Sequence, residues 1–457
     1  MNQKILAALF ASSALLPVPA LAQTSEIDLL REQVSAMRAE ISRLSERIDQ
    51  LQAEPAAPVA ASAFVASPAP TTPAPATPEP VQIAWRGAPE ITGEGGFSFK
   101  PRGRLQVDAG TVSSPAGITD ASTGFGSEIR RAFLGAEGKL PGGFAYRAEI
   151  DIAASSVEIT DLYLTYEASP ELTLMVGHTK PFWGLDEGTS DLFTSFTERA
   201  AFNSAFGHER RLGINAVYAS GPVIVQAGVF TDNVADLNDD ENNSYSLDGR
   251  LVFSPKIGES QLHLAGSVHL RDLNDSATTV RYRARPFIHT PDIRFIDTGS
   301  LSASGENGYG LEAAWISGPF HAAGEWRWQS VDGIGTAPDP TFAGGYAEAG
   351  LFLTRGDTRT YRGGVFDRIR PANPVDAGGI GAVQINVRYD YLDLVDAGIS
   401  GGVQNAYLAS LVWTPTAYTR LMLNYGHLEY SDAAIAGIGG NRDYAADSFG
   451  MRAQVDF

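Results

Sequence analysis

The chain has 457 residues, of which 44% are hydrophobic and 19% are charged, and it contains no cysteine. The absence of thiols excludes disulfides, thiolate nucleophiles and cysteine-ligated zinc or iron–sulfur centres. With 34 basic against 53 acidic residues the formal net charge is -19. This balance argues against a protein that wraps nucleic acid, because neutralising phosphates requires a cationic surface.

Residues 1–22 have the pattern of a signal peptide. Lys4 precedes an apolar run, and Ala20, Leu21 and Ala22 form a small-residue cleavage site. The apolar run is shorter than the ~20 residues that a membrane-spanning helix needs, so an N-terminal anchor is the weaker alternative. No later apolar stretch is long enough to span a membrane as a helix. The exported protein is therefore soluble, anchored at a surface, or a membrane β-barrel.

Residues 23–52 predict a short coiled coil. Apolar residues recur alternately three and four positions apart, at Ile27, Leu30, Val34, Met37, Ile41, Leu44, Ile48 and Leu51. β-Branched residues at one core position and Leu or Met at the other favour a two-stranded assembly. An amphipathic helix packed against a globular core is the alternative.

Residues 53–90 are assigned to a linker, because Ala, Pro, Thr and Ser dominate its first 28 positions. Such a composition cannot build a core and predicts an extended, semi-rigid spacer. The spacer separates the coiled coil from a domain at residues 91–457.

Alternation with a period of two recurs through residues 91–457 and predicts β-strands. The final strand is the clearest example, with Phe449, Met451, Ala453, Val455 and Phe457 on one face and Gly450, Arg452, Gln454 and Asp456 on the other. Strands are expected near residues 97–110, 127–140, 143–154, 157–168, 171–180, 208–220, 223–232, 244–255, 260–271, 307–317, 320–331, 345–355, 381–394, 405–415, 419–430 and 444–457.

The connections between these sixteen strands alternate between short turns and long loops, although the connection at 356–380 breaks the rule. An even strand number, strands of about ten residues and this asymmetry are typical of outer-membrane barrels. The expected fold is therefore all-β, a sixteen-stranded antiparallel transmembrane β-barrel preceded by a short periplasmic coiled coil and a Pro/Ala-rich linker. A soluble β-sandwich is the weaker alternative.

Several segments together resemble the phosphate-selective porin O/P family. The similar stretches are 128–140, 159–166, 176–182, 198–199, 210–213, 281–286, 388–394 and 452–457. The resemblance spans roughly residues 97–457. It implies an outer-membrane porin of a Gram-negative bacterium, usually a homotrimer, that passes phosphate or other small anions. The trimer that it implies is preferred here over the dimer that the heptads favour.

An anion channel needs cationic side chains that face water and bind weakly enough to release the ion. Arg281, Arg283 and Arg285 share one face of an extended segment, about 7 Å apart, and guanidinium groups fit phosphate oxygens. The resemblance implies an arginine ladder here; a solvated extracellular loop is the alternative. The other candidate path residues are Arg130, Arg131, Lys180, Arg210 and Arg211, and strand parity places Arg102 and Arg104 in the lumen as well.

The third long loop, residues 181–207, lies where porins commonly fold a segment into the barrel. Its aromatic residues, Phe182, Trp183, Phe193, Phe196, Phe202 and Phe206, are expected to pack inward, and Asp186, Glu187, Asp191 and Glu198 accompany them. A trimer contact or a surface lid is the alternative for this loop. Lumen-facing acids are also expected at Asp108, Glu149, Asp151, Asp161, Asp248, Asp390 and Asp456, so the wall is expected to carry a mixed field.

No enzymatic activity and no cofactor are expected. None of the seven histidines forms HExxH or another metal-ligand spacing, and no serine lies in a GxSxG motif. His263 and His269 are interpreted as polar lumen residues. The expected function is passive uptake of small anions, with phosphate or polyphosphate as the expected ion and a weakly selective general-diffusion porin as the alternative. Expected partners are small anions, outer-membrane lipid, two further copies of the chain in a homotrimer and, through the coiled coil, the cell wall; nucleic acid is not expected.

Overall fold

The computed structural model describes residues 43, 81–153, 156–236, 243–274 and 279–457. The predicted signal peptide, the coiled coil apart from Arg43, and the linker up to residue 80 lie outside the described residues. The chain divides into two compact units, Met1–Ala76 and Thr77–Phe457. All of the described strands belong to the second unit.

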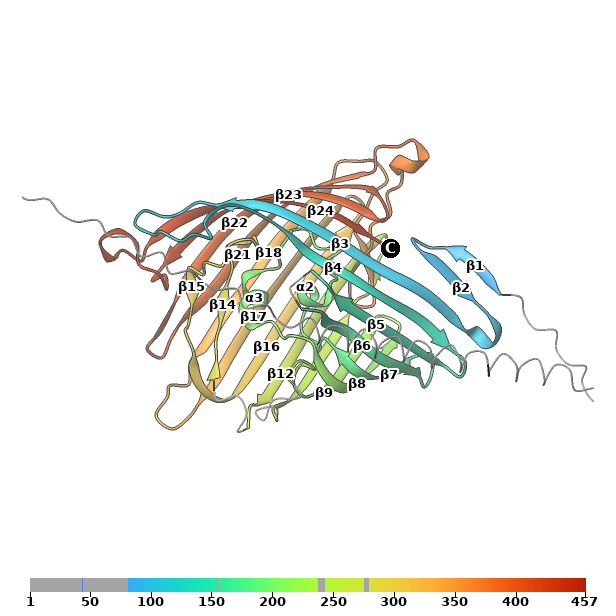
Figure 1. The fold of residues 1–457 in the computed structure, drawn as a ribbon, viewed down its shortest axis with the longest axis horizontal. Coiled ribbons are helices and arrows are strands. Elements are labelled where there is room, and N and C mark those ends of the chain that lie inside the picture. Colours follow the sequence, from blue (N-terminus) through green and yellow to red (C-terminus); the bar gives the residue numbers. More distant parts are fainter. Residues whose placement is uncertain (1–42, 44–80, 154–155, 237–242, 275–278) are drawn as a thin grey trace, which may run out of the picture. The chain divides into compact units, whose positions relative to one another are not determined.

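Sixteen long antiparallel strands form a closed barrel (Figure 1). They are β3 (Ser98–Val112), β4 (Gly124–Leu140), β5 (Phe144–Asp151), β6 (Glu158–Glu167), β7 (Leu172–Thr179), β8 (Arg211–Ser220), β9 (Val223–Phe230), β10 (Tyr245–Phe253), β12 (Ser260–Asp272), β16 (Leu301–Ser317), β17 (Phe320–Gly333), β18 (Thr341–Phe352), β21 (Ala382–Asp396), β22 (Ile399–Thr416), β23 (Thr419–Ser431) and β24 (Tyr444–Asp456). The last strand pairs with the first, from Ser448 opposite Val112 to Asp456 opposite Arg104, which closes the sheet. Each of the sixteen predicted strands overlaps one of these, so the barrel prediction is confirmed.

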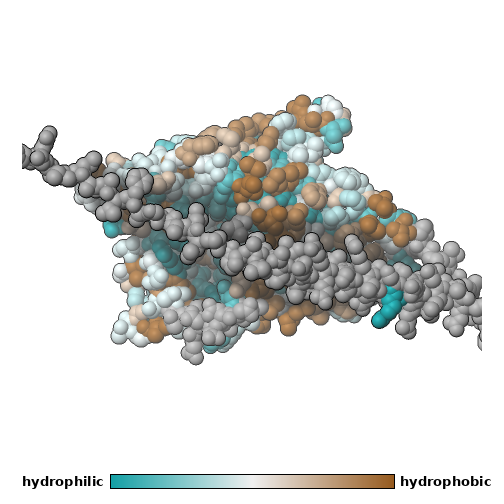
Figure 2. All heavy atoms as spheres, in the orientation of Figure 1, coloured by the Kyte–Doolittle hydropathy of each residue, from teal (hydrophilic) through white to brown (hydrophobic). Residues whose placement is uncertain are grey.

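The two faces of the wall differ as the alternation predicts. On β24, Phe449, Met451 and Val455 are exposed on the outside, whereas Arg452 and Asp456 are buried inside. Hydrophobic residues form patches on the visible outer surface (Figure 2). An apolar outer band around a polar interior is the arrangement that a lipid bilayer requires. Among the described residues, no helix is long and apolar enough to span a membrane.

The structure differs from the predicted linker at its C-terminal end. Residues at the end of the predicted spacer form β1 (Gln82–Trp85), which pairs with β2 (Pro89–Thr92). β2 in turn pairs with β3 through Ile91 and Phe99. The run in β1 contains no proline, so it can form a hydrogen-bonded ladder where the preceding Pro-rich chain cannot.

Short elements lie in the connections. They are η1 (Glu94–Gly96), α2 (Leu185–Gly188), α3 (Ala201–Phe206), β11 (Lys256–Ile257), β13 (Thr279–Val280), β14 (Arg283–Ala284), β15 (Ile296–Asp297), β19 (Thr360–Arg362), β20 (Val365–Asp367), η2 (Val375–Ala377) and η3 (Ile438–Gly440). Three connections that carry several of these elements fold into the barrel and supply its apolar core.

The first inward segment is L3, residues 180–210, which carries α2 and α3. Its side chains of Trp183, Leu185, Phe196 and Phe202 are almost completely buried. The backbone N–H of Asp186 donates to Oε1 of Glu325 on β17, at 2.6 Å. The aromatic residues of the third long loop therefore pack inward, as the sequence predicts.

The second inward segment is L5, residues 273–300, of which 273–274 and 279–300 are described. The ring of Tyr282 packs edge-on against Phe206 of L3, with 5.4 Å between centroids. Further along, Nδ1 of His289 lies 2.9 Å from Glu128 on β4. L5 thus reaches from β16 to β4 and packs against L3.

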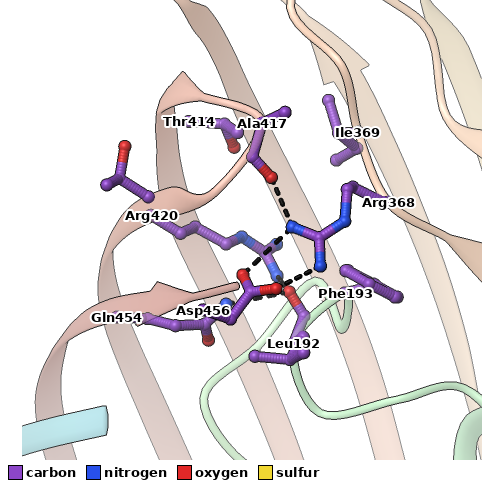
Figure 3. Close-up of a pocket in the computed structure, with 10 residues that line it drawn as sticks. Leu192, Phe193, Arg368, Ile369, Thr414, Ala417, Arg420, Gln454 and Asp456 are labelled. Atoms are coloured by element: carbon purple, nitrogen blue, oxygen red, sulfur yellow. Dashed lines mark hydrogen bonds and ion pairs between the residues drawn. The ribbon is translucent and has the colours of Figure 1, made fainter. Parts of the chain in front are cut away.

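The third inward segment is T6, residues 353–381, which connects β18 to β21 at the short-turn end. Its hairpin, β19 and β20, reaches Arg250 on β10, which donates to the carbonyl oxygen of Gly364 at 2.9 Å. Phe366 meets L3 through a 3.3 Å hydrogen bond from its N–H to Oγ1 of Thr189. Arg368 pairs with Asp456 on β24 (Figure 3). The irregular connection in the sequence is therefore a hairpin that enters the barrel and supports L3 from the short-turn end.

Candidate functional site

The inward segments cover one side of the barrel interior more completely than the other. The less covered side is the candidate ion path. Along the wall from β10 to β23, the side chains of Arg250, Arg327 and Arg388 are 3%, 0% and 1% exposed. Beside β3 to β8, the side chains of Arg147 and Lys180 are 29% and 30% exposed. Solvent therefore reaches the interior along the β3–β8 wall, past one edge of L3.

A β-bulge in β4 directs two consecutive arginines into this space. The pairing with β3 shifts between Gln106 opposite Arg131 and Val107 opposite Ile129, so Arg130 is the additional residue. In a regular strand, one of two neighbouring side chains points outward. The bulge turns the side chain of the additional residue toward the inside as well. Accordingly Arg130 lies 3.3 Å from Glu198 and Arg131 lies 2.7 Å from Asp191.

L3 supplies the carboxylates that hold these arginines. Asp191 pairs with both Arg131 and Arg104. Glu198 pairs with Arg130 and, at 3.1 Å, with Arg452 on β24. Burial alone would raise the pKa of Asp191, but Arg104 and Arg131 outweigh it and hold the pKa well below its usual range. The cluster therefore keeps its carboxylates ionised at neutral pH.

A second chain of ion pairs continues along the wall through β3 to β8. Arg102 and Arg147 both lie 2.8 Å from Glu137. Arg147 and Arg210 then share Asp161, at 3.6 and 2.6 Å. Because each carboxylate bridges two guanidinium groups, the arginines are held as a continuous row on one wall.

Lys180 and Arg199 end this row at L3. Both pair with Glu187, and the Arg199–Glu187 distance is 3.4 Å. Desolvation inside the barrel is the largest influence on the partly exposed Lys180 side chain and lowers its pKa to about 8; Arg199 adds to the lowering and Glu187 opposes it. Burial would raise the pKa of Glu187, but Arg199 and Lys180 keep it below its usual value.

The ion pairs that link the candidate path involve more cations than carboxylates. The eight cations are Arg102, Arg104, Arg130, Arg131, Arg147, Lys180, Arg199 and Arg210, and the six acids are Glu137, Glu149, Asp161, Glu187, Asp191 and Glu198. Guanidinium forks on one wall can bind an oxyanion with two parallel hydrogen bonds. The interleaved carboxylates weaken each such contact, which permits release.

The structure brings together four of the predicted path residues, Arg130, Arg131, Lys180 and Arg210. The fifth, Arg211, points elsewhere: it lines a cavity of about 260 Å³ with His208, Arg271 and Glu306. Its neighbour Arg210 is the last residue of L3, just before β8 begins at Arg211. Arg210 faces the path, where it pairs with Asp161.

Among the described residues, no ion pair joins the predicted arginine row of L5 to the β3–β8 wall. Arg281 and Arg283 are exposed, whereas Tyr282 between them is buried against L3. Arg281 pairs with Asp297 at 2.5 Å, and Arg285 donates to the carbonyl oxygens of His289 and Pro291. Exposure therefore alternates from Arg281 to Arg283, but Arg281 and Arg285 are engaged within L5.

Sequence reasoning does not single out Arg147 and Arg199 as path residues. Arg147 lies on the polar face of its strand, which marks it as inward-facing without indicating which part of the lumen stays open. Arg199 lies in an irregular loop, where no periodicity reports direction. Their positions depend on contacts with Glu137 and Glu187, which are ten or more residues away.

Comparisons with known proteins agree with this architecture. A family model described as phosphate-selective porin O and P matches residues 99–457. An uncharacterized protein of Caulobacter vibrioides is 44% identical over 481 residues, covering 99% of this chain and 96% of its own length. Porin O of Pseudomonas aeruginosa is 26% identical over 355 residues, covering 70% of this chain and 78% of its own. The anion-selective porin of Comamonas acidovorans has a similar fold, with a TM-score of 0.50, 13% identity, and coverage of 79% of this chain and 100% of that one.

Proposed function

Because the chain belongs to the phosphate-selective porin O and P family and forms an outer-membrane porin channel, we propose that this channel takes up small anions passively, with phosphate as the principal ion. The observation that carries the proposal is the row of cations on the water-accessible β3–β8 wall. No chemical step is part of this function, and no cofactor is required.

The proposed route has two stages. Anions first meet the exposed arginines of L5, of which Arg283 is solvent-facing. They then pass along the β3–β8 wall, where Arg131, Lys180 and Arg147 offer successive guanidinium or ammonium groups. Each cation already has a carboxylate partner, so an incoming phosphate competes for the cation and is held weakly. Weak, repeated binding favours flux over retention.

Planar-bilayer recordings test the proposal with a matched pair of variants. Arg147→Gln with Lys180→Gln removes two charges from the path. Arg86→Gln with Arg355→Gln removes two charges from exposed positions outside it. We expect the path variant to shift the reversal potential in a chloride gradient toward cation preference. It should also weaken phosphate block of chloride current several-fold, which corresponds to about 1 kcal/mol.

The six carboxylates along the path make a weakly selective general-diffusion porin the second candidate. That function predicts little phosphate block in the wild-type protein and similar behaviour of the two double variants. Either result would refute phosphate selectivity while leaving the porin assignment intact.

We further propose that the protein assembles as a homotrimer through its barrels, with the predicted coiled coil as a periplasmic spacer or cell-wall tether. A barrel wall offers a much larger contact area than about four heptads. Deleting residues 23–80 should therefore leave trimers on native gels and in light scattering. A monomeric truncated protein would assign oligomerisation to the coiled coil.

A further inference from the structure

Three side chains of the kinds that bind metals meet between L3 and the barrel wall, outside the candidate ion path. His208 lies near the end of L3, Asp248 lies on β10 and His269 lies on β12. All three are buried. The ligand atoms that they offer lie within 4.8 Å of one another. The two imidazole rings are in contact, with 3.7 Å between their centroids.

Hydrogen bonding leaves nitrogen lone pairs available in this cluster. Nδ1 of His269 lies 2.7 Å from Oδ1 of Asp248, which fixes the ring and places its proton on that side. Among the described residues, Nε2 of His269 and Nε2 of His208 have no hydrogen-bond partner. A carboxylate that holds one imidazole nitrogen while the other faces a metal is the usual arrangement around protein metal sites.

The surroundings provide a dry wall on one side and an opening on the other. Trp183 packs against both imidazoles, with centroid distances of 4.4 Å to His208 and 5.7 Å to His269. On the other side, His208 lines the 260 Å³ cavity, which supplies an entry route. Glu306 lines the same cavity, and its Oε1 lies 3.7 Å from Nε2 of His269.

The charged groups around this cavity favour a cation. Arg271 pairs with Glu306 at 3.2 Å and with Asp232 at 3.0 Å. Arg211 adds a second guanidinium beside the cavity, and Asp248 adds a third carboxylate. Glu209, Asp236 and Arg281 also line the cavity, so five carboxylates and three guanidinium groups surround it, which leaves a net negative charge that a cation would neutralise.

We propose that His208 and His269 bind a divalent transition-metal ion of the zinc class through their Nε2 atoms, with Asp248 as the carboxylate that holds His269 in place. Imidazole nitrogen with carboxylate oxygen is a donor set that zinc takes readily, at about 2.0–2.2 Å. Tetrahedral ligand atoms at that distance are roughly 3.4 Å apart. Side-chain rotations that move the ligand atoms by about 1 Å would therefore bring them to metal-binding distance. Glu306, whose Oε1 is 3.7 Å from Nε2 of His269, and water molecules supply the remaining ligands.

A bound ion would join the end of L3 to two strands of the barrel wall. His208 is two residues from Arg210, which faces the candidate ion path. The metal would therefore fix the end of the loop that borders the path, although its ligands do not touch the path. This inference does not depend on which anion the channel carries.

Metal content of the untagged, full-length protein, purified in detergent from outer membranes, tests the site. After chelator treatment and re-equilibration with zinc chloride, we expect about one bound zinc per chain in the wild type. His208→Gln and His269→Gln should each weaken binding at least tenfold, because losing even an outer-shell partner of a ligand typically costs about 10–100-fold in metal affinity. His427→Gln, which alters an exposed histidine on β23, should bind as the wild type does.

Cobalt provides a readout on the wild-type protein that does not require any variant to fold. Cobalt(II) in a tetrahedral nitrogen–oxygen site should give intense visible bands that zinc abolishes and magnesium does not. Absence of these bands, or equal zinc binding by the wild type and both ligand variants, would overturn the proposal. Folding of each variant is checked by its heat-modifiable band on gels.

Discussion

Lys180 is the residue of the candidate path whose charge changes nearest to neutral pH, because burial and Arg199 lower its pKa to about 8. A lysine is charged below its pKa and neutral above it. The path should therefore lose one positive charge as the pH rises from about 7 to about 9.5, and anion preference should fall over that range.

Reversal potentials at the two pH values measure this effect. Lys180→Arg keeps the charge throughout and should abolish the pH dependence, whereas Lys180→Gln should resemble the high-pH wild type across the whole range. A pH response that survives in Lys180→Arg would assign the titration to another group.

Substituting Asp191 removes a negative charge from the path, whereas deprotonation of Lys180 removes a positive one. It pairs with Arg104 and Arg131, so Asp191→Asn releases two guanidinium groups toward passing ions. We expect stronger anion preference and several-fold tighter phosphate block, about 1 kcal/mol. Glu90→Gln likewise removes a carboxylate charge and releases Arg86, which is 73% exposed and outside the path, and should have little effect. Equal effects would mean that long-range charge, and not the Asp191 cluster, sets selectivity.

The β4 bulge shows how far alternation can predict which side chains face the lumen. Alternation correctly predicts that Arg131 faces the lumen together with Glu137, because both follow the bulge. It cannot predict that Arg130 also reaches a lumen carboxylate, because a bulge depends on the register with β3. The two consecutive arginines identify the position as unusual, but not its cause.

Among the elements, T6 is the one whose removal has the clearest expected outcome. The hairpin enters the barrel and touches Arg250, Thr189 and Asp456, on β10, L3 and β24. Replacing residues 356–378 with a short glycine turn should empty the short-turn end of the lumen and raise single-channel conductance. Shortening the exposed loop at residues 335–339, between β17 and β18, is the control and should leave conductance unchanged. Unchanged conductance in the T6 variant would show that the constriction lies elsewhere.

Strands and inward segments differ in how far the sequence determines them. Each long strand is predictable because its two faces meet lipid and polar interior, and period-two alternation records that difference locally. L3, L5 and T6 acquire their positions from remote contacts, such as Tyr282 with Phe206. The aromatic content of L3 and the anomalous length of T6 indicate inward packing, whereas the open β3–β8 wall exists only when all three segments are in place.

For the whole molecule, net charge is a poor guide to selectivity. The chain carries a formal charge of -19, yet the ion pairs that link the candidate path join eight cations to six carboxylates. Ions in a narrow channel respond to the groups within a Debye length, about 8 Å at physiological ionic strength. The local composition of the wall therefore matters more than the distant acids of the surface.

Phe457 extends the strand pairing that closes the barrel. Phe457 exchanges backbone hydrogen bonds with Gly103 on β3, at 3.0 and 3.2 Å. Its ring occupies the space that a side chain at position 103 would need. Phe457 therefore completes both the ladder and the packing at the junction between the first and last strands.

We expect Phe457→Ala to lower the temperature at which the folded barrel converts to the unfolded band on gels, and to reduce the amount assembled in outer membranes. Because the ring remains 40% exposed, the loss should be below the ~3–5 kcal/mol that truncating a fully buried Phe costs. Phe449→Ala is the matched control: it truncates a ring on the same strand that is 41% exposed and does not pack at the strand end. Gly103→Val should reproduce the Phe457→Ala defect, since the new side chain displaces the ring. If Phe449→Ala is equally damaging, the effect reflects lost lipid contact and not failure to close the barrel.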